Sequence, residues 1–180
     1  MFEHHMNLTE EQDAILNGSK GDTMAKVMET MIRYGELFGA KSLVPVTSKY
    51  NHLVTSFGLK ALGPVYDLMD QLIEAGALSK QPFSADPRPL DKNVPSSFLQ
   101  NIVFNHFMYS KQDFYEGQLR KLGLMEKDAF TCTCYMDEVG NKPEQGEVLS
   151  WSESSAVVYA HSVLGARCNR NSGIIDLMGS

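Results

Sequence analysis

Residues 150–165 carry the strongest folding signal in this 180-residue chain. Ser150-Trp151-Ser152-Glu153 has the spacing of a capping box, in which a serine is followed three residues later by a glutamate and a helix begins. Ala156-Val157-Val158-Tyr159-Ala160 comes next, and Gly165 is a natural C-terminal stop. Because this run is apolar all round, we expect a helix that is buried on most of its faces.

Apolar residues at helical spacing predict several more helices. Thr9-Glu10-Glu11-Gln12 has a capping-box pattern, so a helix should begin there and end near Leu16. Further helical patterns, each with a glycine at its end, cover the ranges 22–39, 65–76 and 110–123.

Short apolar and β-branched segments predict strands between these helices. The patterns place buried strands at residues 42–46 and 52–56, although Pro45 interrupts the first, and an extended segment at residues 129–135. Residues 79–97 contain four prolines and are expected to form a long irregular connection. Helices that alternate with short strands indicate an α/β layer architecture.

The composition restricts the partners and the location of the chain. The net charge is −6, so no broad basic surface for nucleic acid is expected. Apolar runs are too short to span a bilayer, and the first residues lack the features of a secretory signal. We therefore expect a cytoplasmic protein without a membrane partner. Three cysteines, an odd number, favour free thiols or a metal site over a disulfide framework.

The first turn of the helix predicted after Glu153 is a candidate ligand site. Ser154 and Ser155 lie where free backbone N–H groups and the helix dipole favour an anion, such as a carboxylate or a phosphate. Arg167 and Arg170 follow the same helix and can clamp that anion. The alternatives are that Glu153 only caps the helix and that the arginines only complement its C-terminal dipole.

Cysteine and histidine side chains provide further candidates. Cys132 and Cys134 would point to opposite faces of a strand but would converge in a turn, and burial as plain thiols is the alternative to a metal site. His52 lies at the end of a strand-like segment and is either a site residue or a structural histidine. His161 lies within the helix predicted to be buried, so we expect it to make a core hydrogen bond.

Several of these segments together resemble the aconitase X family, in the order in which that family has them. Thr131-Cys132-Thr133 followed by Tyr135 resembles the family motif Thr-Cys-Thr-Pro-Tyr. The resemblance extends over essentially the whole chain and is weakest between residues 79 and 128. Its other blocks are Leu8–Glu11 with Gly18 and Gly21, Ala40–His52, Gly146-Glu147, Trp151–Ala160, Ser162–Arg167 and Asn169-Arg170.

This resemblance implies a hydro-lyase in which an iron–sulfur cluster of the 2Fe–2S or 4Fe–4S type helps to remove water from a small hydroxy acid. Cis-3-hydroxy-L-proline is the preferred substrate, and mevalonate 5-phosphate is the alternative. The implied fold is α/β and aconitase-like, with helices packed on a small, mostly parallel sheet. Residues 1–180 would form an N-terminal portion of the catalytic region, whose partner is a small swivelling domain or subunit.

The resemblance also implies roles for individual residues. Cys132 matches a ligand of the cluster, with Cys134 and Cys168 as secondary candidates. The implied catalytic residues are Ser154, Ser155 and His52. The implied substrate-binding residues are Arg167, Asn169, Arg170 and Glu153.

Three departures from the family pattern leave other hypotheses open. Cys134 stands where the family has proline, His161 where it has asparagine, and Cys168 where threonine is usual. One alternative is a non-catalytic remnant that binds a partner or a ligand, and another is a cluster held by Cys132, Cys134 and Cys168 themselves. Family chains are longer and carry further cluster cysteines, so we expect an incomplete cluster here. An exposed apolar face would then favour a homo-oligomer.

Overall fold

The computed structural model describes residues 2–90, 93–166 and 171–180. In chain order, its elements are α1 (Glu10–Leu16), α2 (Gly21–Leu37), β1 (Asn51–Leu53), α3 (Gly63–Glu74), β2 (Phe83–Ala85), α4 (Phe98–Gln100), the π-helix η1 (Asn101–Met108), α5 (Gln112–Leu122), α6 (Ser154–Ser162) and α7 (Gly173–Gly179). Within these ranges, no helix combines the length and the apolar character that crossing a bilayer requires.

The helices predicted from apolar spacing are confirmed by α1, α2, α3 and α5. Thr9 caps α1 as expected: its hydroxyl accepts from the N–H of Gln12, while its own N–H donates to the Gln12 side chain. α5 ends at Gly123, whose φ of +117° is readily adopted only by glycine. The apolar stripe of each longer helix is therefore a reliable guide to its position in the chain.

A small parallel sheet lies between the helices, which confirms the expected arrangement. β1 pairs with β2 in a register that places Asn51 opposite Phe83. Extended residues on both sides continue this parallel pairing as single bridges, which join His52 to Trp151, Phe83 to Leu124 and Ala85 to Phe130. Because all of these pairings are parallel, the chain leaves each segment at the same edge of the sheet.

Two of the strand predictions need correction. β1 is shorter than the predicted strand at 52–56 and begins one residue earlier. Residues 42–46 do not form a strand, because only Ser42 pairs, through a single bridge to Asn7. Pro45 has no N–H to donate to a neighbouring strand, which accounts for the missing ladder.

Residues 79–97 are not irregular throughout, because they contain β2. Phe83, Ser84 and Ala85 are all buried, at 0%, 0% and 2% exposure. Three residues are too few for the alternating apolar pattern that identifies a strand in a sequence. Asp86 follows this strand directly, so β2 determines where its carboxyl group lies.

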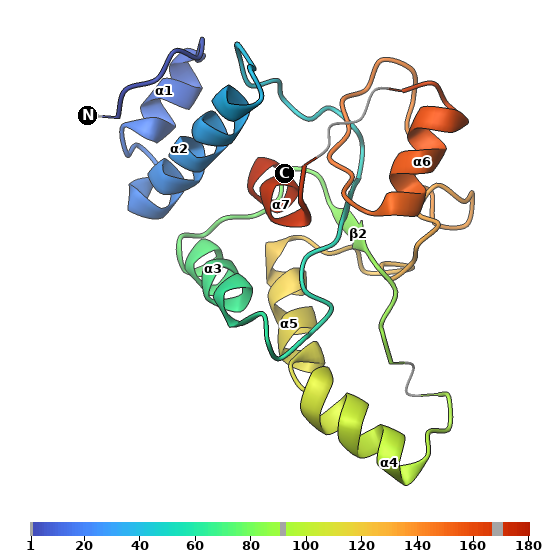
Figure 1. Ribbon diagram of the computed structural model, residues 1–180. Coiled ribbons are helices and arrows are strands. Elements are labelled where there is room, and N and C mark those ends of the chain that lie inside the picture. The colour runs from blue at the N-terminus through green and yellow to red at the C-terminus, as the bar shows by residue number, and fades with distance from the viewer. Residues whose placement is uncertain (1, 91–92, 167–170) are drawn as a thin grey trace.

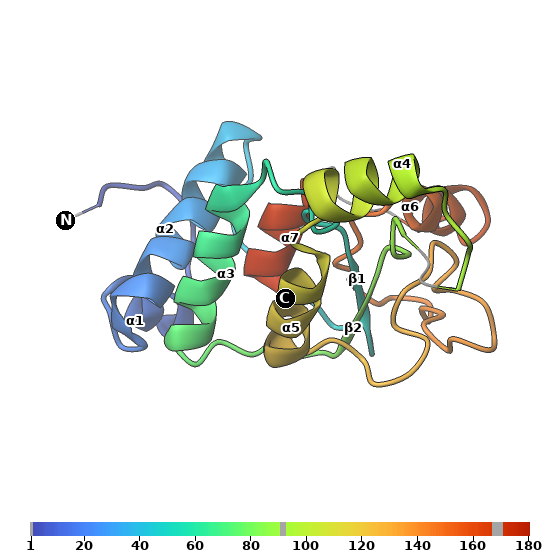
Figure 2. The same ribbon diagram turned by 90° about the horizontal axis from the view of Figure 1, so that it is seen from below.

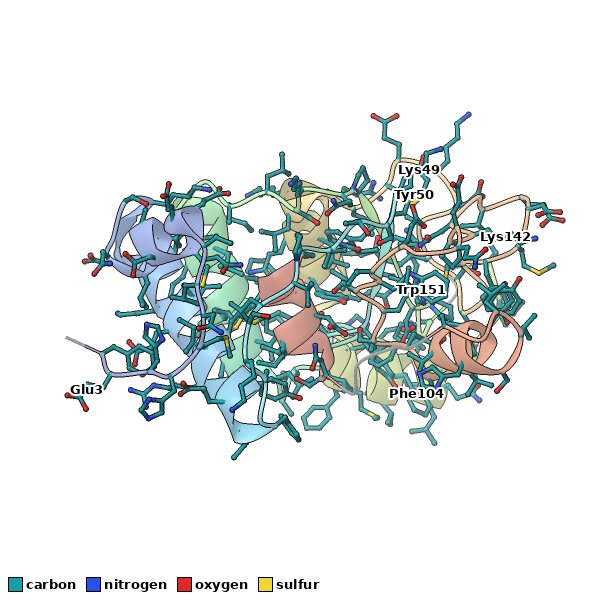
Figure 3. All side chains as sticks on the ribbon, turned by 90° about the horizontal axis from the view of Figure 1, so that it is seen from above. Glu3, Lys49, Tyr50, Phe104, Lys142 and Trp151 are labelled. Carbon is teal, nitrogen blue, oxygen red and sulfur yellow. The ribbon has the colours of Figure 1, made fainter. Side chains whose placement is uncertain are left out.

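Two apolar clusters lie on opposite sides of the sheet. The larger is built from α2, α3, α5, α7 and both strands, and the smaller joins α6 to the segment around Trp151. Figures 1 and 2 show α1, α2 and α3 on one side of the strands and α6 on the other. Trp151 is 1% exposed and lies between the sheet and α6 (Figure 3).

The start of α6 differs from the prediction. Glu153 itself is the N-cap residue, and its carboxylate accepts from the N–H of Ala156 at 2.9 Å. Ser150 does not cap the helix, because its hydroxyl donates to the carbonyl of Asp176 in α7. The expected capping box is therefore wrong, although the predicted helix and the capping role of Glu153 are confirmed.

The surface of α6 also differs from the prediction. Only Ala156 and Ala160, one turn apart, are buried, and they pack in the smaller cluster. Val158 is 61% exposed and His161 is exposed as well, so the prediction that this histidine lies in the core is wrong. A run that is apolar all round does not specify which face has a partner.

α4 and η1 form an extension at one end of the molecule (Figure 1). Its apolar side chains are exposed to solvent rather than packed in either cluster. They are Phe98, Leu99, Ile102, Val103, Phe104 and Phe107. An exposed apolar face was expected, and the homo-oligomer inferred from it stays a prediction.

Gly173, at the start of α7, tests the packing of this helix against the strand β1. A Cβ atom at residue 173 would lie 1.3 Å from the carbonyl oxygen of Val54. We expect Gly173→Ala to lower the free energy of unfolding by about 3 kcal/mol in urea denaturation, because backbone must move to make room. Gly117→Ala in α5 is the matched control: nothing lies within 4 Å of its added Cβ, and we expect it to gain about 1 kcal/mol. Equal stability of the two variants would contradict this packing.

Candidate functional site

Three side chains with lone pairs meet at one edge of the parallel sheet. His52 lies in β1, Asp86 follows β2, and Glu153 follows the extended segment that pairs with β1. His52 Nε2 is 3.8 Å from Asp86 Oδ1 and 4.0 Å from Glu153 Oε2. The three atoms all lie within 4.8 Å of one another. Parallel pairing explains the convergence, because each segment delivers its side chain to the same region of the sheet.

The imidazole of His52 is fixed by hydrogen bonds on its other nitrogen. Nδ1 lies 2.9 Å from the hydroxyl of Ser84, and an additional hydrogen bond to the Ser84 backbone raises the pKa of His52, as expected where a carbonyl accepts from the ring. We therefore assign the hydrogen to Nδ1, which leaves a lone pair on Nε2. Burial is the largest effect and lowers the pKa of His52 to about 4, so the ring is neutral at pH 7.

Ser84 is itself held by neighbouring amide groups. Its hydroxyl lies 3.4 Å from the carbonyl oxygen of Asn51 and 3.4 Å from Nδ2 of Asn141. Asn141 Nδ2 also donates to the Asn51 carbonyl at 3.0 Å. All of these residues are buried, so the orientation of the imidazole is set by the folded sheet.

Asp86 and Glu153 differ in how their charge is stabilised. Asp86 Oδ1 is buried without a hydrogen-bond partner among the described residues, and burial together with the charge of Glu153 raises the pKa of Asp86 to about 7. Burial also raises the pKa of Glu153, but hydrogen bonds from Ser155 and from the N–H of Ala156 outweigh it, so this pKa lies below its ordinary value. The carboxylate of Glu153 is thus stabilised by its helix, whereas Oδ1 of Asp86 has no donor in the part of the chain that the structure describes.

The two serines predicted as an anion seat contact Glu153 instead. Ser154 Oγ lies 3.2 Å from Oε1 of Glu153, and Ser155 Oγ lies 2.5 Å from Oε2. The Ser155 hydroxyl is also 2.6 Å from the carbonyl oxygen of Cys132. A hydroxyl has a single hydrogen, so these two acceptors compete for it. The first turn of α6 is therefore already occupied by a carboxylate of the chain, and substrate binding by the serines stays a prediction.

The two described cysteines have different environments. Cys132 is exposed beside the acidic pair, and burial, Glu153 and Asp86 together raise its pKa. Cys134 is fully buried in the smaller cluster, and mainly this burial raises its pKa to about 12. Among the described residues, only one thiol is therefore exposed, whereas an iron–sulfur cluster is held by several thiolates. This part of the chain does not fit such a cluster unaided.

Four further predicted site residues follow α6 in the sequence. Arg167, Cys168, Asn169 and Arg170 lie outside the described residues. The structure thus brings together His52, Glu153, Ser154, Ser155 and the backbone of Cys132. Cys134 is buried behind them in the smaller cluster, where the charges of Glu153 and Asp86 also raise its pKa.

Sequence reasoning missed Asp86, and with it Ser84 and Asn141. The available signal was an acidic residue directly after the buried segment Phe83-Ser84-Ala85, which is where a parallel strand presents a functional side chain. The surrounding prolines masked that signal, because they favour an irregular connection.

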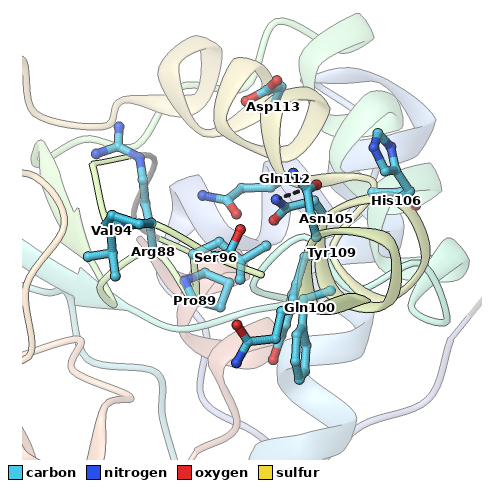
Figure 4. Close-up of a pocket in the computed structure, with 15 residues that line it drawn as sticks. Arg88, Pro89, Val94, Ser96, Gln100, Asn105, His106, Tyr109, Gln112 and Asp113 are labelled. Carbon is cyan, nitrogen blue, oxygen red and sulfur yellow. Dashed lines mark hydrogen bonds between the residues drawn. The ribbon is translucent and has the colours of Figure 1, made fainter. Parts of the chain in front are cut away.

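A separate pocket lies between η1 and residues 88–90 and 94–96, and it has a volume of about 950 Å³ (Figure 4). Arg88, which lines it, is paired with Glu116, with Nε 2.6 Å from Oε1. Its guanidinium also lies over the ring of Phe130. None of the three converging side chains is among the described residues that line this pocket.

Comparisons with known proteins agree on one family. A family model described as the aconitase X first domain matches residues 5–180. The phosphomevalonate dehydratase large subunit of Aeropyrum pernix is 32% identical over 177 residues, which are 96% of this chain and 42% of that subunit. The cis-3-hydroxy-L-proline dehydratase of Hypocrea jecorina is 26% identical over 175 residues, which are 96% of this chain and 27% of that enzyme.

A solved structure has the same fold. The crystal structure of Thermococcus kodakaraensis aconitase X in its holo-form matches with a TM-score of 0.75 and 30% sequence identity, covering 96% of this chain and 40% of that one. The expected aconitase-like fold is thereby confirmed. The chain spans about two fifths of the length of the phosphomevalonate dehydratase subunits that it matches.

Proposed function

The chain belongs to the aconitase X family, and from this premise we propose that it forms part of a hydro-lyase that removes water from a small hydroxy acid. The observation that carries this proposal is the convergence of His52, Asp86 and Glu153 at one edge of the sheet. The group borders the segment of Cys132, whose carbonyl contacts the first turn of α6. This contact supports assigning the buried group and the family motifs to one site.

The chemistry of dehydration suits such a group. Removal of water needs a base for the carbon-bound proton and a positive partner for the departing hydroxide. Among the described residues, His52 Nε2 and Asp86 Oδ1 are buried without a hydrogen-bond partner beside the carboxylate of Glu153. A proton or a cation held between them would stabilise a departing oxygen. Both carboxyl side chains are partly accessible, at 11% for Asp86 and 10% for Glu153, so a substrate can approach them from one side.

Mevalonate 5-phosphate is the substrate that we propose first. The related phosphomevalonate dehydratase subunits are 29–32% identical to this chain, whereas the cis-3-hydroxy-L-proline dehydratases are 24–26% identical. Cis-3-hydroxy-L-proline, the substrate preferred from the sequence, is the second candidate because both enzymes lie within the family.

We propose that activity requires parts beyond these 180 residues. The chain covers 39–42% of the phosphomevalonate dehydratase large subunits, whose name also implies a small subunit. Cys132 would contribute one ligand to an iron–sulfur cluster whose other thiolates come from elsewhere. Such a cluster, when bound, supplies a Lewis acid, and the proposal assigns no step of the reaction to it. We also propose that the protein acts in the cytoplasm.

A hybrid enzyme tests the proposal. This chain replaces the matching 39% of the Thermococcus kodakarensis large subunit, and the hybrid is combined with that organism's small subunit. Anaerobic assays with mevalonate 5-phosphate and with cis-3-hydroxy-L-proline measure the dehydrated product. We expect turnover of the first substrate by the hybrid. An assembled hybrid that dehydrates neither substrate would support the alternative of a non-catalytic binding subunit.

A further inference from the structure

We propose that His52, Asp86 and Glu153 bind one divalent first-row transition-metal cation, through one imidazole nitrogen and two carboxylate oxygens. The ligands of this site are these three side chains and include no cysteine. Binding of the cation follows from the geometry of the chain, and its role as the positive partner in dehydration rests on the proposed function.

The spacing of the three atoms fits a single ion. Ligand nitrogen and oxygen atoms lie about 2.0–2.2 Å from such a cation, so two ligands of one ion are at most about 4.0–4.4 Å apart. The distances from His52 Nε2 are 3.8 Å to Asp86 Oδ1 and 4.0 Å to Glu153 Oε2. These separations are too long for direct hydrogen bonds and lie near the upper limit for two ligands of one ion. Because all three atoms together are held only within 4.8 Å, a bound ion would draw the two carboxylates inward.

The imidazole is prepared for coordination. His52 is 0% exposed, and its Nε2 has no hydrogen-bond partner among the residues that the structure describes. Ser84 holds the hydrogen on Nδ1, so the lone pair of Nε2 points at the carboxylates. A metal-bound histidine is usually oriented in this way by an acceptor on its second nitrogen.

Among the described residues, none with a positive side chain pairs with this site. Across the described residues, no lysine or arginine forms an ion pair with Asp86 or Glu153. Arg88, two residues from Asp86, is paired with Glu116 instead. Asp86 Oδ1 is buried without a hydrogen-bond donor among the described residues, and an unsatisfied buried oxygen is costly unless a ligand completes it. A cation would satisfy the two acceptors that lack a partner, His52 Nε2 and Asp86 Oδ1, and would be balanced by the charge of Glu153.

The donor set defines the class of metal. One imidazole and two carboxylates suit zinc, iron or manganese in the divalent state, whereas thiolate ligands favour clusters and softer ions. Three protein ligands leave a coordination position open for an oxygen of the substrate. The partial exposure of both carboxylates keeps that side accessible.

Zinc titration of the purified 180-residue chain tests this site. After treatment with EDTA, isothermal calorimetry with zinc chloride should give one site per chain. Asp86→Asn and Glu153→Gln should each weaken zinc binding by at least about 10-fold, and Ser84→Ala by about 10-fold through loss of the orienting hydrogen bond. Asp67→Asn, at an exposed acid on α3, and Cys132→Ser should leave the affinity unchanged.

Cobalt substitution identifies the ligands independently. The cobalt-loaded chain should give visible d–d bands without the ultraviolet charge-transfer band of a thiolate ligand. Thermal unfolding in EDTA shows whether Asp86→Asn affects the fold in the absence of metal. The amide removes one of two neighbouring negative charges and can donate to Glu153, so the melting temperature should not fall. Zinc should then raise the melting temperature of the original chain but not of this variant.

Several results would overturn the cation site. These are the absence of zinc binding by the folded chain, affinity that falls in Cys132→Ser but not in Asp86→Asn, or a thiolate band with cobalt. The proposed function is tested separately by the hybrid enzyme. Dehydration without zinc binding would refute the cation site alone, whereas zinc binding in an inactive assembled hybrid would refute the proposed function alone.

Discussion

Asp86→Asn in the hybrid enzyme is expected to lower kcat for dehydration by about 100- to 10,000-fold, the range associated with loss of a positioned acid–base group. The amide would keep the shape of the side chain but could neither carry the negative charge nor exchange a proton as a carboxyl group does. The loss is expected whether Asp86 acts on a proton or on a bound cation. Anaerobic assays under saturating substrate measure this change.

The matched control for this variant is Asp67→Asn, which removes the same charge from the exposed surface of α3. It should keep the original kcat, so that an effect of net charge alone is excluded. Circular dichroism should give the same spectrum for both variants. Full turnover by Asp86→Asn would refute a role for this site in the reaction.

Phe83→Ala is expected to lower the free energy of unfolding by about 4 kcal/mol, because a fully buried aromatic ring leaves a cavity in the core. Phe83 is 0% exposed and lies in the larger cluster. It also begins the strand that ends beside Asp86. Urea denaturation of the 180-residue chain measures this effect. The affinity for zinc should also fall, because β2 loses the packing that holds Asp86 in place.

Phe38→Ala provides the comparison, since Phe38 is 65% exposed at the end of α2. Its truncation removes little buried area, so the free energy of unfolding should change by less than about 1 kcal/mol. If both variants unfold at the same urea concentration, Phe83 does not have the buried position described for it.

The helices were predictable because each has several turns of regular apolar spacing or a local cap. Thr9 and Gln12 of α1 form both hydrogen bonds of the predicted capping box. Such signals act between residues three or four apart, so the sequence contains them complete. The family resemblance was predictable for a similar reason, because its blocks are contiguous segments.

The sheet and its acidic partner were not predictable in this way. β2 has three residues, and its burial comes from α5, β1 and the segment around Phe130, all distant in sequence. Neither alternation nor length distinguishes such a strand from a connection that contains prolines. The approach of Asp86 to His52 depends entirely on this pairing.

The candidate site was predicted in part. His52, Glu153, Ser154 and Ser155 were selected and lie together, but Glu153 occupies the helix terminus that was expected to hold a substrate anion. A capping pattern gives the position of a helix start within a residue or two. Which group then accepts from the free N–H groups of the first turn depends on tertiary structure.

The central claim is that His52, Asp86 and Glu153 face the substrate. A crystal structure of the hybrid enzyme with mevalonate 5-phosphate bound tests it most directly. We predict that the oxygen to be eliminated lies within about 3 Å of a carboxylate of Asp86 or Glu153, as a hydrogen bond requires, or is joined to them through one shared cation. Substrate bound in another cleft, with this group still buried and remote, would contradict the account.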